Sequence, residues 1–300
     1  MNKEALYYQK EENTIKCKLC PHRCAIQEGK SGACRVRVAK KDENGELRLY
    51  STNYGEITSI ALDPIEKKPL NQFYPQSRIL SIGTFGCNFK CPYCQNYRIS
   101  QDKPETKFVS AKDMAIISKE IIDNIGLAFT YNEPIIWYEY VLDVCKNIKK
   151  INPEQKTVLV TNGYINEEPF RELLPYIDAI NIDLKGGKDF YNKLCKGELK
   201  EVENAIRIAY SMKCHLEITT LLVPGENTDY PSLNYIGQFI SSIDKDIPLH
   251  LARYIPSYKM DRKTTALEEI RTSYKLLKPY LNNIYLQDLN EAEYDFCKAK

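Results

Sequence analysis

The feature that most constrains the fold is a regular alternation of short apolar segments and longer helical segments after residue 78. Six of the apolar segments have the length and composition of buried parallel strands. They span residues 79–85, 126–131, 156–162, 178–184, 215–223 and 248–254. Segments with helical spacing separate them, for example 110–123, 134–150 and 265–280. Successive β-α units predict an α/β fold, either an open doubly wound sheet or a full or partial barrel.

Both architectures place chemistry at the carboxyl ends of the strands, and the polar clusters of this chain follow the predicted strands. Six loops are therefore expected to meet at one rim. They read GCNFKCPYC, TYNEP, TNGY, DLKGG, PGENTD and RYIPSY in chain order.

The first 78 residues have a different pattern, with turn signals between short alternating stretches that predict small antiparallel strands. Four cysteines fall within this part, namely Cys17, Cys20, Cys24 and Cys34. Four thiols suit a closed tetrahedral zinc site, which we favour, or a second iron–sulfur cluster that passes electrons to the first. Free thiols are the simpler alternative, and His22 is a substitute ligand for one cysteine. We expect a four-cysteine module over 1–78, a catalytic core over 79–290 and a tail over 291–300.

Composition excludes several classes of protein. The 42 basic and 40 acidic residues give a net charge of +2, which argues against a nucleic-acid or membrane-surface partner. No segment reaches the roughly 18 apolar residues of a membrane span, and no apolar run follows the N-terminal charges. Seven of the 11 cysteines lie in two tight groups, which indicates metal ligation in a reducing compartment, and we expect a cytoplasmic protein. The other four, Cys145, Cys195, Cys214 and Cys297, are interpreted as ordinary thiols.

The segment GCNFKCPYC at 86–94 places Cys87, Cys91 and Cys94 directly after the first predicted strand. Three thiolates on a [4Fe–4S] cluster leave one iron open, and an open iron can chelate a ligand that carries an amine and a carboxylate. Gly86 and Pro92 resist helix, so the loop can wrap around a cluster. The simpler alternatives are reduced thiols or a zinc site completed by a distant residue.

The CxxxCxxC spacing after the first strand of a β-α series resembles the radical S-adenosylmethionine (SAM) superfamily. In that family the open iron holds the methionine part of SAM. One-electron reduction then cleaves SAM to a 5′-deoxyadenosyl radical, which takes a hydrogen atom from the substrate. The resemblance implies a partial (β/α)6 barrel of TIM type and a cluster held by Cys87, Cys91 and Cys94. It also implies that Tyr93 packs against the adenine.

The next loop, TYNEP, is similar to the family's glycine- and glutamate-bearing motif, in which a carboxylate and strand-end carbonyls receive the ammonium group of SAM. Asn132 and Glu133 stand at the positions usually occupied by glycine and glutamate. The resemblance therefore implies that both residues bind SAM. Without it, the Glu133-Pro134 pair would be interpreted as the acidic start of the next helix.

The loops TNG and DLK resemble those of glycyl-radical activating enzymes. The resemblance implies that Lys185 pairs with the SAM carboxylate, that Asp183 helps to bind a monovalent cation, and that Thr161 and Asn162 belong to the same site. Val160 stands where the activating enzymes have an aspartate, so the cation site departs from their pattern.

Four stretches between about residues 58 and 165 resemble the radical SAM member of the AmmeMemoRadiSam system, a relative of pyruvate formate-lyase activating enzymes. Weaker strand-end matches extend to about residue 258, where Ile255 replaces a histidine common in that group. The resemblance implies an electron donor such as flavodoxin or ferredoxin and an unknown protein or small-molecule substrate. The alternatives are a glycyl-radical-enzyme activase and, from another class, an iron–sulfur electron-transfer or metal-binding protein.

Overall fold

The computed structural model describes residues 3–299, and its main feature is a curved, mostly parallel sheet. The strand order is β16-β15-β14-β13-β12-β11-β9-β8, so neighbouring strands follow one another along the chain, with only β10 left out because it belongs to another sheet. Its parallel strands are β9 (Arg78–Gly83), β11 (Asn124–Phe129), β12 (Lys156–Thr161), β13 (Ala179–Asp183), β14 (His215–Leu222), β15 (Leu249–Arg253) and β16 (Ile284–Gln287). β8 (Ser59–Pro64) pairs antiparallel with β9. Because β8 and β16 are not paired with each other, the barrel is partial.

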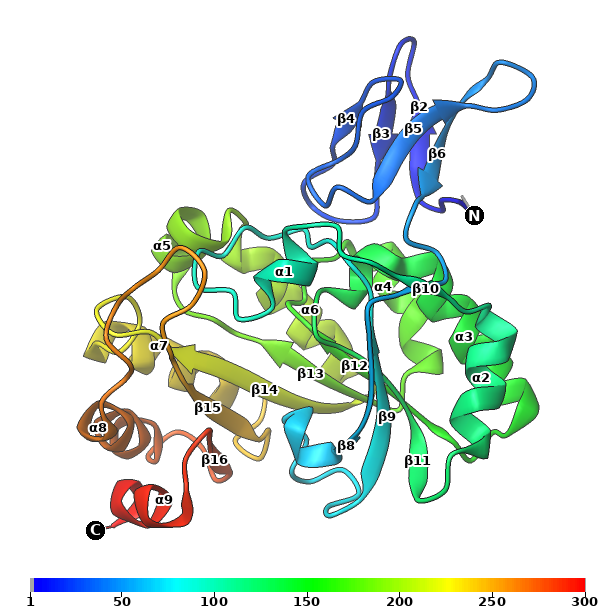
Figure 1. Ribbon diagram of the computed structural model, residues 1–300. Helices are drawn as coiled ribbons and strands as arrows, with labels where there is room; N and C mark the ends of the chain where they lie inside the picture. The colour runs from blue at the N-terminus through cyan, green and yellow to red at the C-terminus, as the bar shows by residue number, and fades with distance from the viewer. Residues whose placement is uncertain (1–2, 300) are drawn as a thin grey trace.

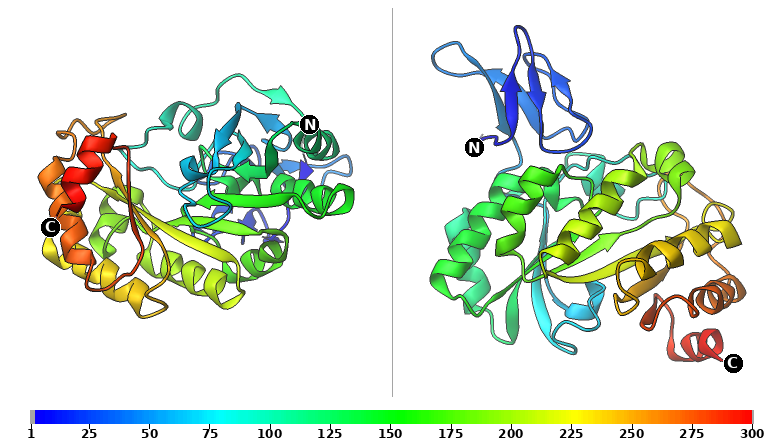
Figure 2. Two further views of the ribbon diagram at one scale, coloured as in Figure 1. Left: turned by 90° about the horizontal axis from the view of Figure 1, so that it is seen from below. Right: turned by 180° about the vertical axis from the view of Figure 1, so that it is seen from behind.

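Helices cover the outer face of this sheet, as the view from below in Figure 2 shows. The α-helices are α1 (Tyr97–Ser100), α2 (Ala111–Glu120), α3 (Tyr138–Ile151), α4 (Glu167–Leu173), α5 (Lys188–Phe190), α6 (Leu199–Ser211), α7 (Tyr230–Ser241), α8 (Leu267–Leu277) and α9 (Glu291–Lys298). Shorter turns are η1 (Ile65–Lys67), η2 (Pro134–Trp137), η3 (Leu174–Tyr176) and the π-helical turn η4 (Tyr191–Cys195). Within residues 3–299, no helix is both long and apolar enough to span a membrane.

Local sequence signals fix where several of these helices start. Ser110 caps α2 by accepting a hydrogen bond from the backbone N–H of Asp113, and Asp229 caps α7 through Ser232 in the same way. Glu133 accepts from the N–H of Ile135 at the start of η2. The Glu133 carboxylate therefore caps the start of η2 and also lies in the loop that follows β11.

The N-terminal part forms small antiparallel sheets of its own. β1 (Lys3–Glu4), β6 (Leu47–Ser51) and β5 (Arg37–Lys41) make one sheet, and β2 (Tyr8–Lys10), β3 (Ile15–Cys17) and β4 (Ala25–Ile26) make another. β7 (Glu56–Ile57) pairs with β10 (Lys107–Phe108). Figure 1 shows the first two sheets above the end of the main sheet that carries α1.

The N-terminal sheets are joined to the main domain by buried polar contacts. The Arg37 guanidinium lies 3.1 Å from the carboxylate of Glu139 on α3, and both side chains are buried. The indole N–H of Trp137 donates to the backbone carbonyl of Asn53 at 2.6 Å. The first turns of the helix after β11 therefore anchor the N-terminal strands.

The predicted fold class is confirmed, since the chain forms a mostly parallel α/β sheet of partial-barrel type with a cysteine-rich N-terminal region. All six predicted strands are present, and β16 extends the series. The predicted boundary at residue 78 stays a prediction, although β8, which precedes it, is a strand of the main sheet.

Candidate functional site

The three-cysteine loop spans residues 84–96, between β9 and α1, and contains no helix or strand. Asn132 braces it from the neighbouring loop. Its side-chain oxygen accepts from the Thr84 N–H at 3.1 Å, and its side-chain nitrogen donates to the Gly86 carbonyl at 2.8 Å. The amide of Asn132 is therefore used to hold the start of the cysteine loop against the end of β11.

Cys87, Cys91 and Cys94 all line one cavity of about 700 Å³ at the carboxyl end of the sheet. Residues at or near the carboxyl ends of β11 to β16 contribute to the walls of this cavity, and β9 contributes through the loop that follows it. The Phe89 N–H donates to the Cys87 sulfur at 3.3 Å, and the Cys94 sulfur lies 3.1 Å from the Ser100 hydroxyl. Four of the six predicted loops therefore meet at this cavity, whereas PGENTD and RYIPSY contribute no residue to its walls and only the strands before them do.

No three His, Cys, Asp or Glu side chains within residues 3–299 are grouped as a site for a single metal ion. The three thiols instead share the cavity with charged and amide side chains.

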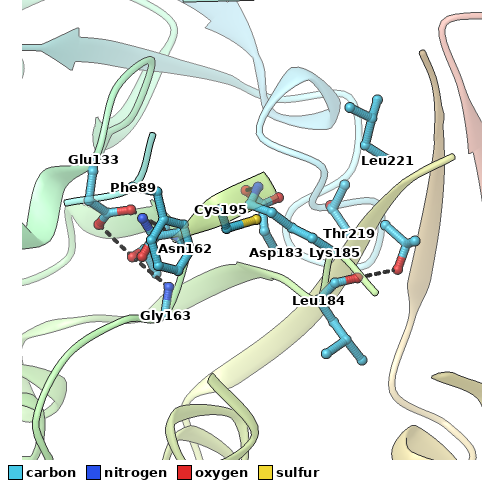
Figure 3. Close-up of polar contacts among 12 residues, drawn as sticks. Phe89, Glu133, Asn162, Gly163, Asp183, Leu184, Lys185, Cys195, Thr219 and Leu221 are labelled. Carbon is cyan, nitrogen blue, oxygen red and sulfur yellow. Dashed lines mark hydrogen bonds and ion pairs between the residues drawn. The ribbon is translucent and has the colours of Figure 1, made fainter. Parts of the chain in front are cut away.

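Glu133 is buried and holds the loops after β11 and β12 together. One carboxylate oxygen accepts from Thr161 Oγ1 at 2.6 Å, and the other accepts from the Asn162 N–H at 2.8 Å (Figure 3). Burial raises the pKa of Glu133 to about 7, although these hydrogen bonds oppose the shift. An ionised carboxylate has about four acceptor positions, so Glu133 retains capacity for a cationic ligand on its cavity side.

Asn162 connects Glu133 to the cysteine loop. Its side-chain nitrogen donates to the side-chain oxygen of Asn88 at 2.8 Å, and the same nitrogen lies 3.9 Å from the Cys87 sulfur. Asn88 in turn donates to the Tyr164 carbonyl at 2.9 Å. Asn88 was not among the predicted site residues, because it stands at an unspecified position between two cysteines and no spacing rule identifies it.

Lys185 and Asp183 leave the end of β13 side by side, and their side chains form an ion pair of 2.6 Å (Figure 3). Both residues line the cavity. Burial opposes a charge on Lys185, but Asp183 and the nearby thiols more than offset it and raise the pKa of the lysine well above its usual value. The ammonium therefore stays charged, and two of its three protons remain for another anionic group. Val160, on the neighbouring strand, also lines the cavity.

Tyr93 is a buried residue of the three-cysteine loop, and its hydroxyl lies 3.5 Å from the Cys195 sulfur. Cys195 ends the π-helical turn η4, and its backbone carbonyl accepts from the Lys90 N–H at 3.1 Å. The interpretation of Cys195 as an ordinary thiol missed this placement. The contact arises from tertiary packing, so nothing in its spacing along the chain signals it.

A second polar group lies on another wall of the cavity. Lys68 is only 2% exposed, pairs with Asp63 at 2.8 Å and stacks over the Tyr131 ring, whose hydroxyl donates to the same carboxylate at 2.7 Å. These three residues come from β8, the turn after η1 and the loop after β11. The sequence interpretation missed them, because β8 was assigned to the N-terminal module.

The other four predicted ligands, Cys17, Cys20, Cys24 and Cys34, surround a separate small space in the N-terminal region. His22, a predicted substitute ligand, directs its Nε2 to the backbone carbonyl of Asn88 at 2.7 Å. That nitrogen is therefore used in a contact with the three-cysteine loop.

Comparison with known proteins gives the family. The family model described as "Radical SAM superfamily" matches residues 81–232. The uncharacterized protein MJ0808 of Methanocaldococcus jannaschii is 36% identical over 98% of this chain and 88% of its own length. A putative glycyl-radical enzyme activating enzyme of the same organism, MJ1227, is 25% identical over 72% of this chain and 92% of its own. The pyruvate formate-lyase-activating enzyme of Staphylococcus epidermidis is 25% identical over 54% of this chain and 68% of its own.

Solved structures share the fold. Streptococcus suis SuiB superposes with a TM-score of 0.56 at 15% identity. The superposition covers 69% of this chain and 48% of the SuiB chain. The structure of anSMEcpe with bound AdoMet gives a TM-score of 0.52 at 17% identity. The superposition covers 68% of this chain and 62% of the anSMEcpe chain. The chain therefore belongs to the radical SAM superfamily, as an enzyme related to the pyruvate formate-lyase activating enzymes.

Proposed function

We propose that this enzyme reductively cleaves SAM at a [4Fe–4S] cluster ligated by Cys87, Cys91 and Cys94. The observation that carries the proposal is the common cavity, in which three thiols from one loop face Glu133 and Lys185. A cluster held there by the three thiolates would supply the electron for breaking the sulfur–carbon bond of SAM, to give methionine and a 5′-deoxyadenosyl radical.

The residues around the cavity fit such a cluster. The three thiols come from one non-helical loop, and Asn132 and Ser100 hold the two ends of that loop by hydrogen bonds. A backbone N–H already faces the Cys87 sulfur, and hydrogen bonds of this kind stabilise thiolate ligands. Cys195 does not line the cavity, so the loop presents three thiols to it.

The remaining side chains have separate roles in holding SAM. Glu133 accepts a hydrogen bond from its ammonium group, and Lys185 donates to its carboxylate while Asp183 keeps that lysine charged. Tyr93 packs against the adenine. Thr161 and Asn162 hold the Glu133 carboxylate in place.

The substrate is proposed to be a protein, as for the glycyl-radical activating enzymes among the relatives. The reductant is then a small electron-transfer protein such as flavodoxin or ferredoxin in the cytoplasm, and the chain is the radical SAM component of an AmmeMemoRadiSam system.

The test is anaerobic reconstitution with iron and sulfide, reduction with dithionite and addition of SAM, followed by mass spectrometry of 5′-deoxyadenosine and methionine. We expect both products from the wild type and neither from Cys87→Ala. Cys214→Ser is the control, since its thiol bonds a backbone carbonyl far from the cavity, and it should retain the activity. An intact cluster whose EPR signal does not change with SAM would instead indicate an electron-transfer protein.

A further inference from the structure

The four N-terminal cysteines face one enclosed space. Cys17, Cys20, Cys24 and Cys34 line it together with Leu19, Ile26 and Ile136. Its volume is about 10 Å³, which is about the space that one water molecule needs. A space of this size favours a single ion over a cubane of four irons and four sulfides.

A backbone N–H group points at one of the sulfurs, as such groups do around a metal bound by thiolates. The Ala33 N–H donates to the Cys24 sulfur at 3.3 Å. This donor compensates negative charge on a thiolate sulfur.

A buried cation lies beside the same space. Arg37 lines the space, its side chain is 2% exposed, and its Nε atom has no hydrogen-bond partner among the described residues. The ion pair with Glu139 balances one charge. Four thiolates around a divalent cation carry a charge of −2, so a neighbouring guanidinium reduces the cost of holding that charge in a buried place.

The loop that carries these cysteines is packed against the three-cysteine loop. A Cβ atom on Gly86 would lie 2.8 Å from the Cys34 carbonyl oxygen and 2.7 Å from the Val36 side chain. His22 donates to the carbonyl of Asn88, and the Leu19 carbonyl accepts from the Asn166 N–H at 3.0 Å. The N-terminal loop therefore contacts both neighbours of Cys87, namely Gly86 and Asn88, and its conformation affects theirs.

From these contacts we infer that Cys17, Cys20, Cys24 and Cys34 bind one Zn²⁺ ion, and that this ion fixes the surface on which the three-cysteine loop rests. Four thiols bind the ion as thiolates and release four protons. The described thiols are not yet grouped at single-ion distances, so binding requires their side chains to turn inward. This site is separate from the proposed SAM chemistry.

The decisive experiment uses the full chain with Cys87, Cys91 and Cys94 all changed to Ala, so that iron at the main cavity cannot interfere. We expect about one zinc per chain by plasma mass spectrometry, with no iron and no sulfide. Replacement of zinc by Co²⁺ should give the visible absorption of a tetrahedral thiolate site. Cys20→Ser with Cys24→Ser should lose both signals, and Cys214→Ser should retain them. This readout does not depend on SAM cleavage, so either proposal can fail alone.

Stoichiometric iron and sulfide in the triple variant would overturn the inference in favour of a second cluster, and absence of any metal would also overturn it. The supporting role has its own measurement, hydrogen–deuterium exchange of residues 84–96 in the full chain. We expect exchange there to become at least severalfold faster when Cys20 and Cys24 are replaced by Ser. Unchanged exchange after loss of zinc would refute that role.

Discussion

The Tyr93 hydroxyl lies 3.5 Å from the Cys195 sulfur, and Cys195 also interacts with the Cys91 sulfur and lowers the pKa of that thiol to about 7. Hydrogen bonds to ligand sulfurs raise the reduction potential of an iron–sulfur cluster. We therefore expect Cys195→Ala to make the cluster harder to reduce. The loss of one hydrogen bond of about 1 kcal/mol corresponds to about 40 mV for one electron.

The measurement is a potentiometric titration followed by EPR. Cys195→Ser keeps a donor at the same place and should shift the potential by a smaller amount. Equal potentials in the alanine variant and the wild type would show that the thiol only fills space.

Glu133 gives SAM binding a pH dependence. Burial raises the pKa of its carboxyl to about 7, and only the ionised form can accept the SAM ammonium. The contribution of Glu133 is therefore about half developed at pH 7 and nearly complete one pH unit higher. Below pH 7 the affinity for SAM falls by up to about tenfold per pH unit. Calorimetric titration of the cluster-loaded enzyme between pH 5.5 and 7.5 measures this slope. Glu133→Gln should bind about tenfold more weakly, and a slope equal to the wild type's would argue against the assigned role.

Asn132 is expected to matter for retention of the cluster. Asn132→Ala removes the hydrogen bonds to Thr84 and Gly86 and should cost about 1–2 kcal/mol of stability together with a lower iron content after reconstitution. Asn290→Ala is the matched control, because it removes the cap of α9 near the C-terminus at a cost of about 1 kcal/mol. Thermal denaturation and iron analysis should show similar stability losses but reduced iron only for Asn132→Ala.

Glu217 sits inside the barrel at the opposite end from the cysteines and accepts from four donors. They are His215 Nε2, His250 Nε2 and the backbone N–H groups of Asn71 and Gln72. Burial opposes ionisation, but the two histidines and these hydrogen bonds lower the pKa of Glu217 to about 2. Its stabilising contribution is complete above the ordinary pKa of 4.5 and is lost as the pH falls through 2.

We expect the titration of Glu217 alone to lower the free energy of unfolding by about 1 kcal/mol when the pH falls from 4.5 to 3.5. Urea unfolding at the two pH values measures the difference. Glu217→Gln should be destabilised by about 3 kcal/mol at pH 7 and should lack this part of the acid sensitivity. Glu46→Gln, at an exposed ion pair, should behave like the wild type.

The sequence was sufficient for the strands that are buried on both faces, because β9, β11, β12 and β13 are short apolar runs between helical segments. β16 was missed, since Ile284–Gln287 is four residues long and alternates apolar and polar residues at the edge of the sheet. β8 was not predicted as a strand of the main sheet for a related reason, since an antiparallel edge strand leaves no β-α signal.

The candidate site was predictable where chemistry requires a local spacing, as for Cys87, Cys91 and Cys94. It was not predictable where distant segments meet. Cys195 reaches the cysteine loop through a π-helical turn, and Lys68 reaches the cavity through a strand paired only at one edge.

The buried pair of Arg37 and Glu139 has a consequence for the order in which the chain can fold. Arg37 leaves the ribosome well before α3, so the N-terminal strands emerge with a guanidinium whose acidic partner has not yet been synthesised. Burying that charge unpaired is costly, and the strands can close over it only after α3 has formed. The N-terminal strands are therefore synthesised first but finish folding late, when α3 provides the surface on which they pack.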